Sequence, residues 1–188
     1  AQIIADSIPD RKTKTILMAS AFEKAGELEL KRGNTDEALG HLYRAARLNI
    51  DLRVHDCEFM KKGAELLTRV GSLDPDKTRA SGTFAKAEQT SQEALSIENH
   101  DNAIIQPCLE RVSNLKENFA RTGDHELIMD AIQHLDSTGG RVQQADKALD
   151  LFIQAKELLV TNERSIDPGQ YASLLRQLEK DIDSCQHK

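Results

Sequence analysis

Apolar positions recur at helical spacing along most of this 188-residue chain. They return every three or four residues within long stretches, and no stretch of four to eight residues alternates between apolar and polar in the manner of a strand. The pattern is typical of amphipathic helices. The sequence therefore predicts an all-α protein with about eight helices, at residues 11–32, 35–48, 52–70, 75–97, 106–122, 125–136, 141–160 and 168–184.

Turn-forming residues separate these segments. Gly33-Asn34, Gly71-Ser72, Gly123-Asp124 and the run Ser-Thr-Gly-Gly at 137–140 mark ends of helices. Proline is expected near the starts of helices, where its missing N–H costs nothing, at Pro9, Pro75, Pro107 and Pro168. Because short connections force neighbouring helices to pack antiparallel, we expect one domain over 1–188 made of hairpins at about 11–48, 52–97, 106–136 and 141–184.

A short motif occurs twice. Residues 22–30 read FEKAGELEL and residues 59–67 read FMKKGAELL, so both fit F-x-K-x-G-x-x-x-L. The helices that follow carry small or apolar residues at spacings of four and three. A pattern that returns behind a glycine-marked turn indicates a structural repeat. The repeat positions are Phe22, Gly26, Gly33, Ala38, Leu42 and Ala45 in the first hairpin, and Phe59, Gly63, Ala80, Phe84 and Ala87 in the second.

Residues 19–52 resemble a tetratricopeptide repeat (TPR), with Phe22 at its first aromatic place, Ala25-Gly26 at its Leu-Gly pair and Gly33-Asn34 at its turn. Glu29 and Ile50 depart from the family pattern, which has Tyr and Pro there. The resemblance is weaker to residue 97 and degenerate beyond, where Lys116 replaces the glycine. Unrelated helical hairpins, or a three-helix domain of the microtubule-interacting and trafficking type, are the alternatives.

The resemblance implies a TPR-like α-solenoid that binds another protein. In that family, the first helix of each hairpin lines a groove that holds a peptide or a partner's helix. The residues expected to bind the partner are Ser20, Glu23, Glu27, Lys31, Met60, Ala64, Glu117 and Arg121, with Leu30, Cys57, Leu67, Thr68, Glu110 and Ser113 on the same faces.

Glu23 and Glu27 bear on the chemistry of that partner. Chaperone-binding members of the family hold a peptide's carboxylates with Lys and Asn at the matching places, and two glutamates there would repel such a ligand. A basic or apolar ligand is therefore expected. A chaperone for secreted or assembly substrates, and a structural helical segment of a larger complex, are the alternative functions.

Composition narrows the classes of partner and of cellular location that are expected. The net charge is −6, with no basic cluster, so nucleic acid is not an expected partner. No apolar run approaches the roughly 18 residues of a membrane span. Cys57, Cys108 and Cys185 are far apart and odd in number, which favours reduced thiols in a cytoplasmic protein. The chain begins Ala-Gln rather than Met, which suggests processing or a piece of something longer.

Three stretches carry candidate chemistry without forming a site. His-Asp-Cys-Glu at 55–58 cannot converge on one metal ion, because neighbours on a helix point about 100° apart. Gly-Asp-His-Glu-Leu at 123–127 has Met129 where a zinc protease motif needs its second histidine. Ser-Thr-Gly-Gly-Arg at 137–141 lacks the Lys-Ser/Thr of a phosphate-binding loop. No enzyme activity, metal or cofactor is therefore expected.

Overall fold

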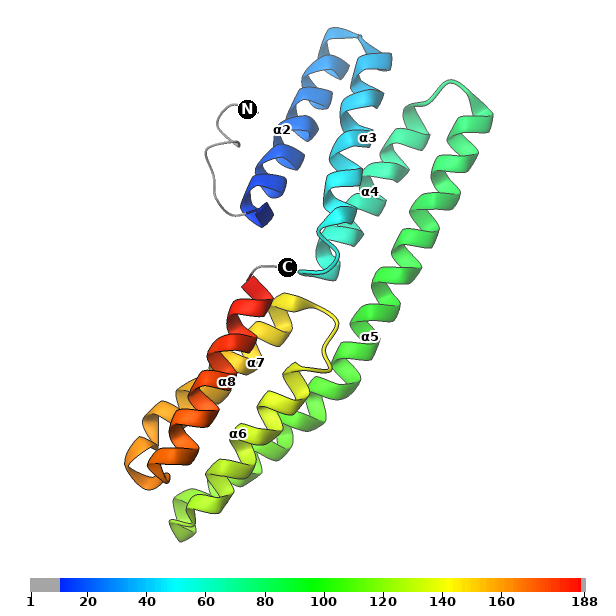
Figure 1. Ribbon diagram of the computed structural model, residues 1–188. Helices are drawn as coiled ribbons and strands as arrows, with labels where there is room; N and C mark the ends of the chain where they lie inside the picture. Colours follow the sequence, from blue (N-terminus) through cyan, green and yellow to red (C-terminus); the bar gives the residue numbers. More distant parts are fainter. Residues whose placement is uncertain (1–10, 187–188) are drawn as a thin grey trace. The chain divides into compact units, whose positions relative to one another are not determined.

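The computed structural model describes residues 11–186, and every regular element in that range is helical (Figure 1). The all-α prediction is confirmed, with seven α-helices in the described residues rather than about eight. Pro9, expected near the start of the first helix, lies outside the described residues. The helices are α2 (Arg11–Arg32), α3 (Thr35–Asp51), α4 (Cys57–Leu73), α5 (Lys77–Thr122), α6 (His125–Gly139), α7 (Ala145–Thr161) and α8 (Pro168–Gln186), with a 3-10 turn at Glu163–Ser165 before α8.

Helix α5 accounts for the difference in number. The sequence predicted a break before Pro107, but Pro107 lies inside one continuous helix. An internal proline loses a backbone hydrogen bond and costs about 3 kcal/mol or more. Residues 98–105 contain no glycine that would favour a turn, and Cys108 and Leu109, directly after the proline, pack into a hydrophobic cluster. That burial offsets the local cost and keeps the segment helical.

The chain forms two compact units, at residues 1–96 and 97–188, and the division falls within α5. We call them unit 1 and unit 2. Among the described residues, unit 1 contains α2, α3, α4 and the first part of α5, and unit 2 contains the rest of α5 with α6, α7 and α8. Each unit has its own hydrophobic cluster.

The turn between α2 and α3 is closed by backbone and side-chain bonds together. Gly33 has a φ of +82°, a conformation that glycine adopts without strain. Its N–H donates to Leu30 O, and the N–H of Asn34 donates to Glu29 O, which is the Schellman arrangement of a helix end. The Glu29 carboxylate also accepts from the Asn34 amide and from Arg32, and these contacts hold its pKa below the usual range. Glu29, a departure from the TPR pattern, thus stabilises the turn.

Helices α2 and α3 approach closely at Gly26, as the repeat predicted. A Cβ atom on Gly26 would lie 2.8 Å from Leu42 Cγ and 3.3 Å from Ala38 O. Ala38, Leu42 and Ala45 are fully buried in the same contact. Together with the two-residue connection, this contact makes the first hairpin antiparallel (Figure 1).

The second copy of the motif packs differently from the first. A Cβ on Gly63 would meet Ala46 O of α3 at 3.0 Å, so this glycine lies against the preceding helix. The close contact with α5 occurs at Gly71 instead, where a Cβ atom would lie 3.1 Å from the ring of Phe84. The similar sequences at 22–30 and 59–67 therefore serve different helix pairs.

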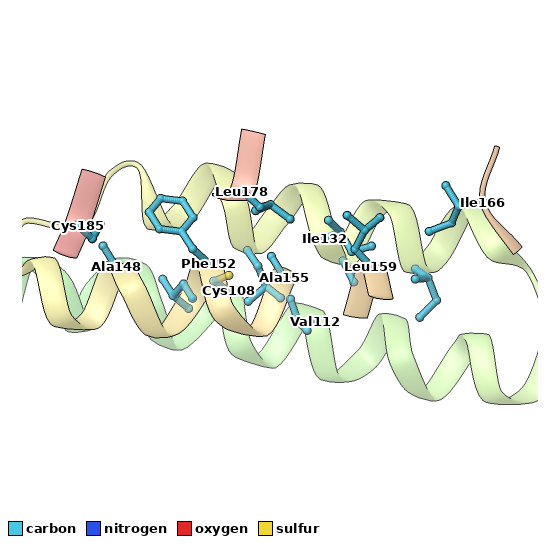
Figure 2. Packing of buried hydrophobic residues seen from close by; sticks show 14 residues of the cluster. Cys108, Val112, Ile132, Ala148, Phe152, Ala155, Leu159, Ile166, Leu178 and Cys185 are labelled. Atoms are coloured by element: carbon cyan, nitrogen blue, oxygen red, sulfur yellow. The ribbon is translucent and has the colours of Figure 1, made fainter. Parts of the chain in front are cut away.

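Unit 2 is built around α7, which packs against α6 and α8. Phe152, Ala155 and Leu159 of α7 point into the cluster that also holds Leu178 of α8 (Figure 2). Gly139, at the end of α6, gives the Phe152 ring its space, because a Cβ there would lie 2.7 Å from the ring. Two of the three cysteines, Cys108 and Cys185, are buried in unit 2, and Cys57 is buried in unit 1.

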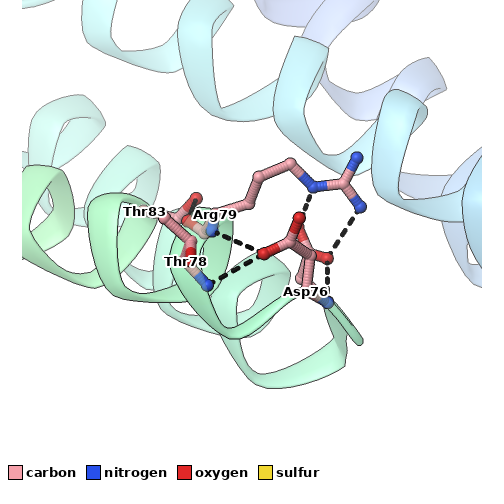
Figure 3. A network of polar contacts seen from close by, with 5 residues as sticks. Asp76, Thr78, Arg79 and Thr83 are labelled. Atoms are coloured by element: carbon pink, nitrogen blue, oxygen red, sulfur yellow. Dashed lines mark hydrogen bonds and ion pairs between the residues drawn. The ribbon is translucent and has the colours of Figure 1, made fainter.

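The start of α5 shows why its first residue is later than expected. Asp76, rather than Asp74, caps the helix by accepting from the N–H groups of Thr78 and Arg79 at 2.9 and 3.2 Å (Figure 3). Asp74 instead accepts from the Arg79 guanidinium at 2.8 and 3.0 Å. This hydrogen-bonded pair holds the pKa of Asp74 below its usual range.

Alanine substitution at two glycines in neighbouring helices should change the free energy of unfolding in opposite directions. Gly26→Ala forces Leu42 to move and should lower the free energy of unfolding by about 1–3 kcal/mol. Gly40→Ala has no atom within 4 Å of its Cβ position, so it should raise the free energy of unfolding by about 0.5–1 kcal/mol through helix propensity alone. Urea unfolding followed by circular dichroism measures both. Equal effects of the two variants would contradict the close contact at Gly26.

Candidate functional site

The acidic face predicted on α2 is neutralised within the chain. Glu23 Oε2 lies 2.8 Å from Lys62 Nζ, and Glu27 Oε1 lies 3.3 Å from Arg69 Nη1. Both cations come from α4, where they are two helical turns apart on one side of the helix. The two glutamates are therefore not the free paired carboxylates that the sequence suggested. A basic ligand has less to gain here than expected.

Four residues of α4 that were expected on a binding surface belong to the interior. Met60 and Ala64 have exposed fractions of 0% and 3%, and Cys57 and Leu67 are buried as well. Helix α4 packs on α3, and its residues share a hydrophobic cluster with Ala87 of α5, so it buries more than one face. The expected surface placement of these four residues is wrong, because an apolar stripe does not reveal whether its partner is the same chain or another.

The remaining candidates have different surroundings. Ser20 is half-buried and Lys31 is exposed in the last turn of α2. Arg121 donates to the Asn118 side chain. Glu117 lines a hollow in unit 2 together with Ser113. A role in binding stays a prediction for all of them.

Unit 1 has a hollow of about 600 Å³ between α3 and α5. Its two cations are already engaged, since Arg79 pairs with Asp74 and Lys86 Nζ donates to Tyr43 Oη at 3.1 Å. Lys86 also lies over the Tyr43 ring, 5.4 Å from its centre. A ligand would have to break these contacts to use either charge, which makes this hollow the weaker candidate.

Unit 2 has a groove whose two hollows of about 530 and 400 Å³ share Val112, Lys116 and Gln154. We call it the α5/α7 groove, because these two helices supply its walls while α6 supplies part of its floor. Most of its deeper side chains are apolar and its outer ones polar. The lining residues are Leu109, Val112, Ser113, Lys116, Glu117, Phe119 and Ala120 of α5, Ile128 and Leu135 of α6, Gln154, Glu157, Leu158 and Thr161 of α7, and Asn162 directly after α7.

Four polar side chains along this groove are available to bind a ligand. Within residues 11–186, the side chains of Lys116, Gln154 and Glu157 form no hydrogen bond or ion pair, and neither does Glu117. In unit 1, by contrast, the comparable charges of α2 and α4 pair with each other. Apolar depth with a few polar side chains around it, not paired within the protein, is the usual composition of a binding groove.

One signal in the sequence pointed towards this place. Lys116 occupies the motif position that Gly26 and Gly63 fill in the first two hairpins. A glycine lets two helices touch, whereas a lysine side chain needs space and an aqueous end. Lys116 is exposed and lines both hollows. The sequence did not point to the α7 residues of the groove. The fourth hairpin departs so far from the repeat that it does not show which residues of its first helix face outward.

A buried carboxylate fixes one wall of the groove to the other. Asp101 of α5 is fully buried and accepts from Gln143 N at 3.0 Å, Gln144 N at 3.1 Å and Gln144 Nε2 at 2.9 Å. His100 Nδ1 lies 3.2 Å from the same carboxylate. Burial alone would raise the pKa of Asp101, but these hydrogen bonds outweigh it and hold the pKa below the usual range. The start of α7 is thus tied to α5.

Comparison with models of known protein families, with curated protein sequences and with solved structures finds no match to this chain. In the part of the chain that the structure describes, no helix has both the length and the hydrophobicity needed to cross a membrane. The geometry of the groove is therefore the basis for a functional proposal.

Reversing the charges of Glu23 and Glu27 on α2 should lower the stability of the fold. Glu23→Lys with Glu27→Lys places cations beside Lys62 and Arg69, so it should lower the free energy of unfolding by about 0.5–2 kcal/mol, given up to roughly 1 kcal/mol for each exposed pair. Adding Lys62→Glu and Arg69→Glu should recover most of the loss. Thermal unfolding of the double and quadruple variants measures this. No recovery in the quadruple variant would show that the two helices do not meet through these pairs.

Asp101→Asn should destabilise unit 2 by about 1–3 kcal/mol near neutral pH, because hydrogen bonds to a charged acceptor are lost. The folded-state pKa is depressed, so the stabilisation is complete above the unfolded-state pKa of about 3.9 and is lost as the pH falls through the folded-state value.

The difference between wild type and Asp101→Asn should therefore shrink in acid, as measured by urea unfolding at neutral pH and below pH ~3. Asp130→Asn, an exposed change on α6, is the control and should stay within about ±0.5 kcal/mol. A difference that does not depend on pH would contradict the role given to the ionised carboxylate.

Proposed function

We propose that this chain is a protein-binding module that holds a segment of a partner protein in the α5/α7 groove. The observation that carries the proposal is the combination of an apolar floor with polar side chains that have no partner in the described residues. The α5 wall extends from Leu109 to Ala120, which is about 16 Å of helix at roughly 1.5 Å per residue. That length suits several residues of a helix or peptide.

The side chains suggest how such a segment is held. Phe119 and Leu158 are only partly buried and offer apolar surface to an inserted side chain. Lys116 can donate to a carboxylate or carbonyl of the ligand, and Gln154 can donate and accept. Amphipathic helices bind to grooves of this kind through apolar anchors one or two turns apart.

We also propose that the chain is a divergent helical repeat of TPR type. Support comes from the first hairpin, where Gly26 meets Leu42 and Gly33 closes the turn. The different packing of Gly63 and the lysine at 116 count as divergence. The proposed groove is consistent with the repeat, since its walls come from what would be the first helices of the third and fourth hairpins.

A displayed library of amphipathic helical peptides, selected on the full chain, tests the proposed function. Gln154 lines both hollows, and Gln154→Arg should fill them without removing a contact. Selected peptides should bind this variant at least about tenfold more weakly, a difference of roughly 1.4 kcal/mol. Fluorescence anisotropy measures the binding.

Gln133→Arg, an exposed change on α6 outside the groove lining, is the matched control and should bind as wild type does. Equal thermal unfolding of the two variants excludes misfolding as the cause. The proposed function is wrong if the library yields no binder, or if the binders recognise Gln154→Arg as well as wild type.

A further inference from the structure

One helix of this chain presents a face with the chemistry that the groove requires. Leu17 and Leu28 of α2 are exposed, at 45% and 48%. They are about three helical turns apart, so they lie on the same side of α2. Lys24 and Lys31 fall on that side as well, and within the described residues their side chains have no hydrogen bond or ion pair. The opposite side of α2, with Ala19 and Gly26, is buried.

The charges of this face and of unit 2 are opposite. Helix α2 contains six Lys/Arg and three Asp/Glu. Unit 2 contains ten Lys/Arg and sixteen Asp/Glu, so the net charge of −6 resides there, and unit 1 is neutral. At the groove itself, Glu117 stands on the α5 wall and Glu157 on the α7 wall. Complementary charge of this kind steers two surfaces together and selects their orientation.

The two surfaces also match in length. From Leu17 to Leu28, α2 extends about 16 Å, the same as the α5 wall from Leu109 to Ala120, at roughly 1.5 Å per residue. The groove has two hollows, and the face has two leucines with a lysine between them.

We propose that the ligand of the α5/α7 groove is α2 of a second copy of this chain. This inference rests on the proposed function of the groove as a site for a protein segment. Leu17 and Leu28 enter the groove, and Lys24 and Lys31 approach Glu117 and Glu157. The two surfaces are different patches of the chain, so a single contact is heterologous and leaves one groove and one α2 face free for a further contact. Such contacts close into rings or extend into chains.

The test is sedimentation velocity of the full chain over a wide concentration range at low salt. Wild type should associate as concentration rises, and added salt should weaken association because exposed charges are screened over about 10 Å. Glu117→Lys with Glu157→Lys should weaken association at least about tenfold. Lys24→Glu with Lys31→Glu should do the same, and the variant with all four changes should associate again.

A control separates local pairing from net charge. Glu65→Lys with Glu88→Lys alters two exposed acids of unit 1 and changes the net charge as much as the groove variant does. It should associate as wild type does. Circular dichroism melts of every variant confirm that the fold is intact.

The inference is overturned if wild type stays monomeric at all concentrations, if the groove variant associates normally, or if the four changes together do not restore association. Binding of library peptides distinguishes the two levels. A monomeric chain that still binds selected peptides in the groove retains the proposed function and loses only the second copy as its ligand.

Discussion

The buried carboxylate of Asp101 is the contact on which the arrangement of unit 2 depends. It joins α5 to the start of α7 across more than forty residues of sequence, by accepting from the backbone N–H groups of Gln143 and Gln144 directly before the helix. A buried charge is stable only with several hydrogen bonds, and those bonds require one relative position of the two helices. The walls of the α5/α7 groove are therefore held at a fixed register before any ligand arrives.

Side-chain size at a few positions then decides which helix pairs touch and which leave space. Gly26 and Gly139 allow Leu42 and Phe152 to reach the backbone of a neighbouring helix, so those contacts are closed. Lys116 has the corresponding motif position in unit 2 and lines both hollows of the groove. The α2–α3 contact is thus closed at a glycine, whereas the α5/α7 groove is open beside a lysine.

Local signals in the sequence were sufficient for the all-α class and for the positions of most helices. Helical periodicity, Gly33 and Gly123 at positive φ, and the aspartates before helices act over a few residues, so they can be recognised without a structure. Pro107 led to a wrongly predicted helix break, because the burial of the residues after it outweighs the tendency of proline to end a helix. Met60 and the Glu23–Lys62 pair could not be assigned correctly, because both depend on how α2, α3, α4 and α5 pack. The groove depends on Asp101 and Gln144, whose meeting no local pattern encodes.

The three buried cysteines allow local opening of each unit to be followed by thiol labelling. A thiol reacts only when it reaches solvent as a thiolate, so the labelling rate of a buried cysteine reports how often its surroundings open. Cys57 lies in unit 1, whereas Cys108 in α5 and Cys185 near the end of α8 lie in unit 2. Mass spectrometry of labelled peptides can therefore follow local opening at three points of the unmodified chain. Comparing the labelling rates of the three cysteines therefore shows which part of the chain opens first.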